Sequence, residues 1–239
     1  MKSNRIGITW QLSDQHGWGV YAFNLALELI RNGPCPPLLL APPVMLEFPP
    51  SLERTFAPYI EEQAALLAQI ENSARQTILN TVACLFVFGN MFLGAPINQM
   101  VRGRANIGLI AYETAHFDAS ARERAAFLDC ILATSSWNRD YLQTIRFDNV
   151  EFVSQGIDTE RFKPAPRLDA GDGRFRIFSG GKLEFRKGQD TVLAAFRRFH
   201  QRHPDCILVT TWHNPWPESA RSIAGSPHLD VAPAVVEGA

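Results

Sequence analysis

The sequence predicts an α/β fold built on a doubly wound parallel sheet. Short apolar runs recur along the chain, and stretches of helical periodicity separate several of them. Most of the runs are continuously apolar rather than alternating, which is typical of strands covered by helices on both faces. Alternation of such strands with helices favours a parallel sheet between two helical layers.

Composition and length limit the classes of protein to be considered. The 239 residues are 46% hydrophobic and 20% charged, which excludes a chain disordered throughout. The length fits one large domain or two small ones. The formal net charge of -1 provides no bulk positive field, so we predict no nucleic-acid partner. No apolar run approaches the roughly 20 residues that a membrane-spanning helix needs.

Eight apolar runs have the length of strands. In chain order they are residues 6–10, 38–41, 82–88, 106–112, 130–134, 150–154, 175–179 and 206–211.

Four helices are predicted between these runs. The first carries Val20 to Ile30 and ends at Gly33 and Pro34. A long amphipathic helix is expected from Ile60 through Ile78. The third helix covers residues 137–146 and is capped by Ser135 or Ser136. The fourth carries residues 192–199, is capped by Asp190 or Thr191 and ends at Pro204.

The segment Lys163–Arg174 is rich in proline, glycine and charge, which is typical of an interdomain linker. We therefore predict one domain over residues 1–165 and the start of a second over 166–239. The second contains only strand, helix and strand, and one such unit leaves a sheet face and an edge open. We expect that this piece docks on the first domain or that the chain is incomplete.

The four cysteines are far apart and form no C-x-x-C pair, so we expect buried, reduced thiols. His213 follows a strand but has no cysteine or carboxylate at metal-ligand spacing. No metal site is predicted.

The most informative segment is residues 150–211. It contains Gln155-Gly-Ile-Asp-x-x-x-Phe-x-Pro164, then Gly180-Gly-Lys-Leu and Arg186-Lys-Gly. This order resembles the retaining GT-B glycosyltransferases of family 4, which have N-G-V-D-x-x-x-F-x-P between two Rossmann-like domains and G-R-L…K-G in the second. Gly17-Trp-Gly19 and the strand-to-helix step at 132–138 match earlier elements of that family.

The resemblance implies an enzyme that moves a sugar from a nucleotide-sugar to an acceptor with retention, without a metal or other cofactor. Negative charge grows on the departing diphosphate, so cations there stabilise the transition state more than the ground state. By motif position, the catalytic cations are Lys182, where the family has arginine, and Lys187. The helix after Gly188 should offer backbone amides at its N-terminus. The other predicted donor-diphosphate contacts are Gly17, Gly19, Gly180, Gly181 and Arg186.

Three polar residues follow predicted strands, where open α/β sheets place their ligands. They are Asn90, Glu113 and His116, and we assign them to the cleft that would hold the acceptor or a sugar. The resemblance implies a carbohydrate or lipid-linked acceptor. It also favours a cytoplasmic protein, with peripheral contact at the inner face of the membrane if the acceptor is lipid-linked.

Alternatives remain open. The family's paired glutamates of the second domain are not found after Thr211, so we expect a truncated glycosyltransferase. The alternative is a complete but non-catalytic binding module derived from such an enzyme. A more remote alternative is a dinucleotide-dependent oxidoreductase, because Gly17-Trp-Gly19-Val-Tyr-Ala22 fits G-x-G-x-x-A. Against it, the loop before Gly17 is long, and Pro42 rather than an acid follows the second strand.

Overall fold

A computed structural model of the chain describes residues 4–166 and 172–228. The chain divides into two compact units, Met1–Asp158 and Thr159–Ala239, each of which is described by itself. The predicted domain boundary at residue 165 lies within the second of these units. Part of the predicted linker, residues 167–171, falls outside the described residues.

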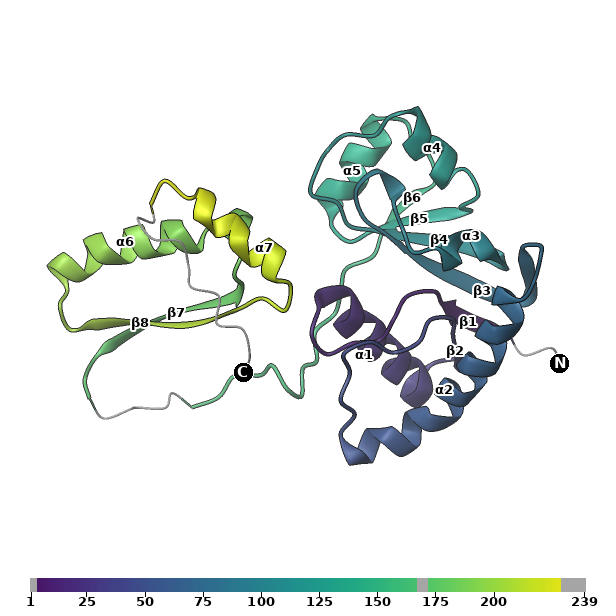
Figure 1. Ribbon diagram of the computed structural model, residues 1–239, viewed down its shortest axis with the longest axis horizontal. Coiled ribbons are helices and arrows are strands. Elements are labelled where there is room, and N and C mark those ends of the chain that lie inside the picture. Colours follow the sequence, from purple (N-terminus) through teal and green to yellow (C-terminus); the bar gives the residue numbers. More distant parts are fainter. Residues whose placement is uncertain (1–3, 167–171, 229–239) are drawn as a thin grey trace. The chain divides into compact units, whose positions relative to one another are not determined.

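The first unit is an α/β structure with a six-stranded parallel sheet (Figure 1). Its strand order is β2-β1-β3-β4-β5-β6, and every neighbouring pair is parallel. The strands are β1 (Arg5–Ile8), β2 (Pro37–Leu39), β3 (Thr77–Phe88), β4 (Val101–Ile110), β5 (Cys130–Ala133) and β6 (Val150–Phe152). Each of the six apolar runs predicted in this region therefore contains part of a strand.

Helices cover both faces of this sheet. Successive residues of β3 point to opposite faces, so Cys84 and Phe86 join one apolar cluster while Leu85 and Val87 pack on the other. This arrangement explains why the strands are continuously apolar, since neither face is left to solvent. The helices are α1 (Gly17–Asn32), α2 (Pro50–Glu71), α3 (Ile97–Met100), α4 (Ala119–Ala125) and α5 (Ser136–Thr144), with the 3-10 turn η1 (Asn90–Phe92).

The predicted position of the long amphipathic helix is wrong at both ends. Helix α2 begins at Pro50, because proline fits the first turn of a helix, and it ends at Glu71. Ile78, expected in that helix, lies in β3 and pairs with Arg102 of β4. Tertiary pairing of the strand therefore overrides the apolar period that continued past Glu71.

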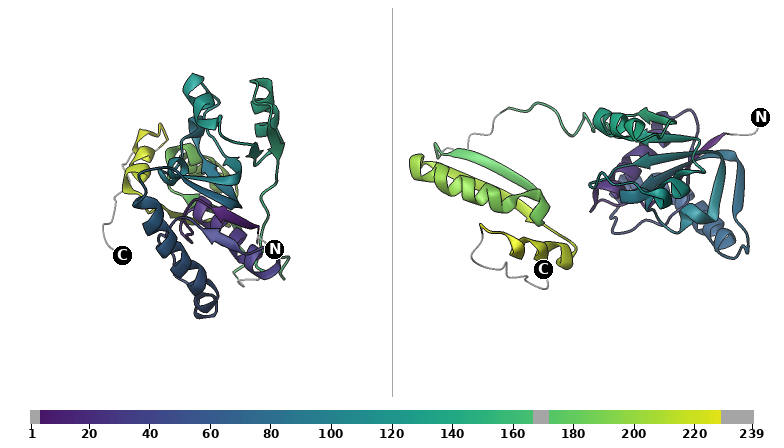
Figure 2. Two further views of the ribbon diagram at one scale, coloured as in Figure 1. Left: turned by 90° about the vertical axis from the view of Figure 1, so that its right-hand side faces the viewer. Right: turned by 90° about the horizontal axis from the view of Figure 1, so that it is seen from above.

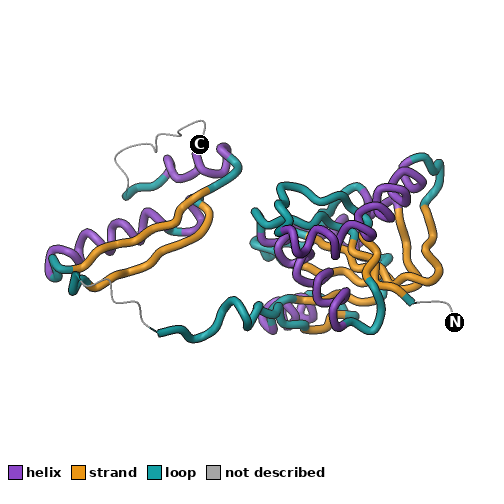
Figure 3. Tube along the Cα trace, turned by 90° about the horizontal axis from the view of Figure 1, so that it is seen from below, coloured by secondary structure: helices purple, strands orange, loops and turns teal. Residues whose placement is uncertain are grey.

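The second unit contains a parallel pair of strands and one long helix. Strands β7 (Phe175–Lys182) and β8 (Cys206–His213) pair in register from Phe175 opposite Cys206 to Lys182 opposite His213. Figures 2 and 3 show α6 (Gln189–Arg202) running along the two strands. The unit also contains η2 (Phe185–Lys187), α7 (Pro217–Arg221) and η3 (Ser222–Gly225).

The open sheet face expected for this unit is visible in its side-chain exposure. Phe178 and Val209 lie directly opposite each other in the two strands and are 68% and 40% exposed. Residues paired across parallel strands point to the same side, so both lie on one uncovered face.

The four cysteines form no disulfide, but only two of them are buried. Cys84 and Cys206 are buried, whereas Cys35 and Cys130 are partly exposed. Burial raises the pKa of the Cys84 thiol to about 11. Within the described parts of the chain, no helix is long and apolar enough to cross a membrane.

Candidate functional site

The first unit has a topological switch point between β1 and β3. From β1 the chain forms β2 on one side of that strand and then crosses to form β3 on the other. In open α/β sheets, ligands bind outside the carboxyl ends of strands at such a point. The loops that follow β1, β3 and β4 meet at this edge of the sheet because all strands are parallel.

The glycine loop after β1 is held by internal contacts. His16 caps α1, and its Nδ1 accepts a hydrogen bond of 3.1 Å from the Gly19 amide. A Cβ atom on Gly19 would lie 2.3 Å from Cβ of Ser13, whereas one on Gly17 would meet nothing within 4 Å. Gly19 is therefore required for close packing, and its amide is already used. Gly17 is the exposed member of the pair.

The same loop departs from the dinucleotide-binding fingerprint. Thr9 to His16 separate β1 from α1, where the fingerprint has a tight turn. The chain continues from β2 through Leu40 and Ala41, without an acid that could bind a ribose. Both objections to an oxidoreductase raised by the sequence therefore hold in the structure.

Asn90 lies in a strained turn at the end of β3. The two residues that follow it, Met91 and Phe92, have φ angles of 60° and 54°, in the left-handed region that non-glycine residues rarely occupy. Arg124 supports the turn by donating a 2.8 Å hydrogen bond from Nε to the Met91 carbonyl. Backbone strain of this kind persists only where surrounding contacts enforce it, and it is concentrated at functional sites.

Asn90 and Glu113, both predicted cleft residues, are brought together by backbone contacts. The Asn90 side-chain oxygen accepts hydrogen bonds from the amides of Glu113 (2.7 Å) and Thr114 (3.1 Å). The hydroxyl of Tyr141 donates a 2.7 Å hydrogen bond to the Ala115 carbonyl in the same loop. Asn90 thus positions the loop after β4, and the side chains of Glu113 and His116 on that loop are exposed.

An aromatic cluster lies beside this loop, and the sequence analysis missed it. It consists of Tyr112, Phe117, Trp137 and Tyr141, which come from the segments after β4 and β5. Burial raises the pKa of Tyr112 to about 12, so its hydroxyl stays protonated and donates to the Asn138 carbonyl at 3.4 Å. The sequence feature that could have indicated this cluster is that an aromatic residue follows each of two strands closely, Tyr112 after β4 and Trp137 after β5.

In the second unit, the predicted site residue Gly181 and the nearby Gly188 have conformations that other residues avoid. Gly181, near the end of β7, has a φ of 128°, and Gly188, which caps α6, has a φ of 72°. The chain needs glycine at both places because a Cβ atom would strain the backbone. Lys182, at the end of β7, and Arg186 and Lys187 in η2 lie between these two glycines in the chain.

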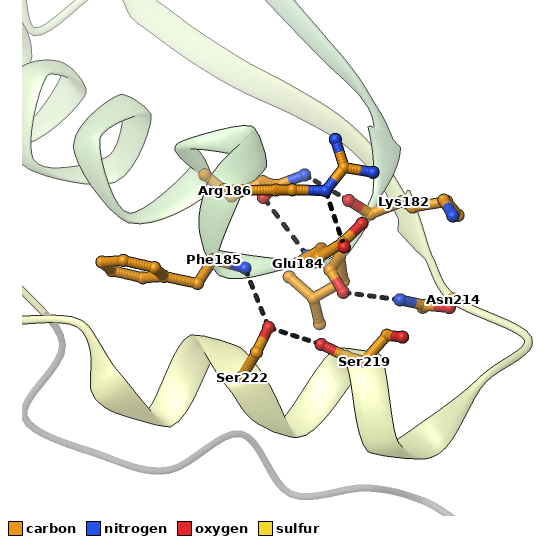
Figure 4. A network of polar contacts seen from close by, with 9 residues as sticks. Lys182, Glu184, Phe185, Arg186, Asn214, Ser219 and Ser222 are labelled. Carbon is orange, nitrogen blue, oxygen red and sulfur yellow. Dashed lines mark hydrogen bonds and ion pairs between the residues drawn. The ribbon is translucent and has the colours of Figure 1, made fainter. Parts of the chain in front are cut away.

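The three predicted cations have different surroundings. Arg186 donates from Nε to Oε1 of Glu184 at 2.8 Å, and Figure 4 shows its side chain directed at that carboxylate. The ammonium of Lys182 lies 4.8 Å from the ring centre of Trp216, a cation–π contact, and it has no ion pair with any residue of the described ranges. Lys187 is exposed and has no ion-pair partner among the described residues. The two lysines therefore retain the positive charge of this loop.

The N-terminus of α6 differs from the sequence-based expectation. Its cap is Gly188, not Asp190 or Thr191, and Asp190 lies buried in the first turn. The Asp190 carboxylate accepts a 2.6 Å hydrogen bond from Ser226 and bonds the amides of Thr191 and of its own residue. These bonds lower the pKa of Asp190, with the Ser226 contact the largest cause. The helix terminus thus already holds an anion supplied by the chain.

The carboxyl end of β8 adds residues that sequence reasoning did not assign to the site. His213 is the register partner of Lys182, and Asn214 donates a 2.9 Å hydrogen bond to the Leu183 carbonyl. The Phe185 amide donates to the hydroxyl of Ser222 in η3 (Figure 4). Gln189 of α6 is buried and donates to the Lys182 carbonyl. Parallel pairing of the two strands brings His213 next to Lys182, while Gln189 and Ser222 hold the backbone of residues 182–185.

The predicted site residues thus fall into two groups. Gly17, Gly19, Asn90, Glu113 and His116 belong to the first unit, and Gly180 to Lys187 belong to the second. Among the described residues, no group of three or more histidine, cysteine or acidic side chains could hold a metal ion. Comparison with known proteins finds no family model that matches the chain, and no curated protein matches its sequence.

Proposed function

We propose that the chain is a glycosyltransferase of the retaining GT-B type, with Rossmann-like units that bind the acceptor and the nucleotide-sugar donor. The observation that carries the proposal is the end of β7, where glycine-rich backbone and two lysines without an ion pair in the described part of the chain lie directly before a helix. Flexible backbone and positive charge in this arrangement suit a diphosphate.

In the proposed reaction, the bond between the anomeric carbon and the diphosphate oxygen breaks, and an acceptor hydroxyl oxygen forms the new bond to that carbon. The electron pair of the broken bond remains on the diphosphate, and the departing diphosphate oxygen takes up the proton that the acceptor hydroxyl releases. Lys182 and Lys187 stabilise the growing charge on the leaving group. The reaction requires no metal in this scheme because the lysines supply the positive charge.

The structure also favours a specific division of roles among the cations. Glu184 compensates Arg186 and orients it, so Arg186 contributes hydrogen-bond geometry more than net charge. Trp216 holds the Lys182 ammonium in place from the neighbouring strand end. This support compensates in part for lysine in the position where the family has arginine, whose planar fork would be pre-organised by itself.

One observation favours the alternative of a non-catalytic binding module. Asp190 places a negative charge in the first turn of α6, next to the region proposed for the diphosphate. Like charges repel, so this carboxylate would weaken donor binding. Release of nucleoside diphosphate from a panel of nucleotide-sugars distinguishes the two functions, since only a transferase consumes the donor.

The direct test of the proposed site measures how much Lys187 contributes to the binding of nucleoside diphosphates. Isothermal titration with UDP, GDP and ADP should show that Lys187→Ala weakens the tightest of the three interactions about tenfold or more, the usual value of a charge-assisted contact. The matched control is Arg198→Ala, which removes an exposed cation from α6 of the same unit. The melting temperature should stay unchanged, because Lys187 makes no ion pair with a described residue. Equal affinity of Lys187→Ala and the wild type for all three nucleotides would remove Lys187 from the proposed site.

A further inference from the structure

The most exposed aromatic side chain of the first unit lies at the start of α5. Trp137 is 61% exposed, although a large aromatic ring gains free energy when it is buried. Its ring is stacked on that of Tyr141, with the two centres 5.6 Å apart and the planes at 7°. With one face against Tyr141 and most of its surface accessible, the indole presents its opposite face to solvent.

Neighbouring aromatic residues fix the position of the Trp137 ring. Tyr141 is itself held by the hydrogen bond from its hydroxyl to the Ala115 carbonyl. Tyr112 lies 6.3 Å from Trp137, and Phe117 packs edge-on against Tyr112 at 5.0 Å. The indole is thus pre-organised by neighbouring aromatic rings, which lowers the entropic cost of binding a ligand on it.

The β4 loop lies beside the aromatic cluster, since the ring centre of Tyr112 is 6.3 Å from that of Trp137 and the Ala115 carbonyl accepts a hydrogen bond from Tyr141. Asn90 and Tyr141 fix this loop through its backbone, and its Glu113 and His116 side chains are exposed. Asn90 itself begins the strained turn, whose next residues are Met91 and Phe92, at the end of the adjacent strand β3. The strained turn and the aromatic cluster both contact the β4 loop, at the carboxyl edge where ligands of parallel sheets bind.

We propose that Trp137, supported by Tyr141, is a stacking platform for a pyranose ring of a saccharide, with hydroxyl partners on the β4 loop. This inference rests on the proposed function and names the acceptor class as a saccharide. A pyranose has a flat face of C–H groups surrounded by hydroxyls. The surface has the same layout, an apolar ring beside carboxylate and imidazole groups, so both parts of the sugar find partners.

The layout also argues against a purely apolar ligand such as an acyl chain. Such a ligand would need a broad apolar surface, whereas the loop beside Trp137 exposes an acid and a histidine. Arg139 and Asp140, which follow Trp137 in α5, form an ion pair at 2.7 Å. Charged groups in both segments fit a hydroxylated ring better than an acyl chain.

The test follows the indole N–H signal of Trp137 in two-dimensional NMR spectra of the full, ¹⁵N-labelled chain. The chain has five tryptophans, so Trp137→Phe identifies the signal by its loss. Methyl β-glucopyranoside, methyl β-galactopyranoside and maltoheptaose are titrated to about 50 mM, the range in which millimolar affinities saturate. We expect a saturable shift of the Trp137 signal with at least one of these sugars.

The variants are compared by saturation transfer from protein to the same sugar. Trp137→Ala should reduce the transfer at least fivefold, and Trp137→Phe should retain part of it because a smaller ring still stacks. The matched control is Ile78→Ala, which truncates a 55%-exposed apolar side chain near the amino end of β3. This control should leave the transfer unchanged.

Three results would overturn the proposal. They are no shift of the Trp137 indole with any of the three sugars, a shift with uridine or adenosine only, and a shift with phosphatidylglycerol vesicles only. The saccharide titration uses no nucleotide-sugar, so its outcome does not depend on transferase activity. If the proposed glycosyltransferase function fails but the inference holds, saccharides will stack on Trp137 and no diphosphate will bind at Lys187.

Discussion

The carboxyl edges of the two parallel sheets differ in how their polar residues are used. In the first unit, three of the five predicted site residues take part in hydrogen bonds that hold loops: His16 binds the Gly19 amide, and Asn90 binds the amides of Glu113 and Thr114. In the second unit, Lys182 and Lys187 make no ion pair with described residues. The first edge is a rigid frame, while the second edge keeps net charge available for a ligand.

This difference shows that a residue that fits a site motif can serve either to hold a loop in place or to bind a ligand. Gly19 and Asn90 fit a site motif, but their contacts show that they hold loops in place. In the proposed function, recognition at the first edge falls to exposed side chains, His116 on the β4 loop and Trp137 in α5. Substitutions in the frame should therefore lower stability, whereas substitutions of the lysines should lower binding.

The largest effect on stability is expected for Gly19→Ala. The added methyl group would lie 2.3 Å from Ser13 Cβ and 2.8 Å from the Ser13 amide nitrogen, which neither can avoid without backbone movement. Overpacking of this kind costs about 1–3 kcal/mol. Urea unfolding followed by circular dichroism measures the loss. In the control, Gly17→Ala, the methyl group meets open space, so unfolding should occur at the same or slightly higher urea concentration. Equal behaviour of the two variants would contradict a packing role for Gly19.

A smaller loss is expected for Asn90→Ala. The substitution leaves the amides of Glu113 and Thr114 without their acceptor, which should cost about 1 kcal/mol because both are near the surface. Asn90→Asp keeps an oxygen in the same place and should be close to the wild type. Amide hydrogen exchange at residues 113 and 114 should accelerate in the alanine variant alone. Unchanged exchange there would show that Asn90 does not hold the loop.

The smallest effect concerns pH and the second unit. The folded-state pKa of Asp190 lies below its usual value because Ser226 and backbone amides bind the carboxylate. The stabilisation is therefore complete above the unfolded pKa of about 4 and is lost as the pH falls through the lower folded value. Asp190→Asn should lower the melting temperature at pH 7, and this difference should shrink at pH 3. The control Asp205→Asn alters an exposed side chain and should show little dependence. A difference for Asp190→Asn that stays constant with pH would mean that the carboxylate charge does not matter.

The strands and most helices were predictable because their signals are local. Continuous apolar runs mark strands buried on both faces, and Ser135 was identified as a candidate cap of α5 from its own short segment. Helix α4 was missed because its sequence, Ala-Ser-Ala-Arg-Glu-Arg-Ala, has no large apolar residue; Asp118 caps it. Helix α2 was misplaced because the apolar period continued into residues that pair as a strand.

The sequence by itself determined the α/β alternation and the loop of glycines and cations at 180–188, since each depends on residues that are close in the chain. Only the tertiary structure decided which polar groups are occupied. Asn90 meets Glu113, Tyr141 meets Ala115 and Asp190 meets Ser226 through strand order and helix packing, which bring together residues more than 20 positions apart. Trp137 and Tyr141 stack because they are four positions apart in α5, but the contact between Tyr141 and Ala115 that brings the pair to the β4 loop is long-range. No local period encodes the long-range contacts, because they arise from the burial of apolar faces shared by distant segments.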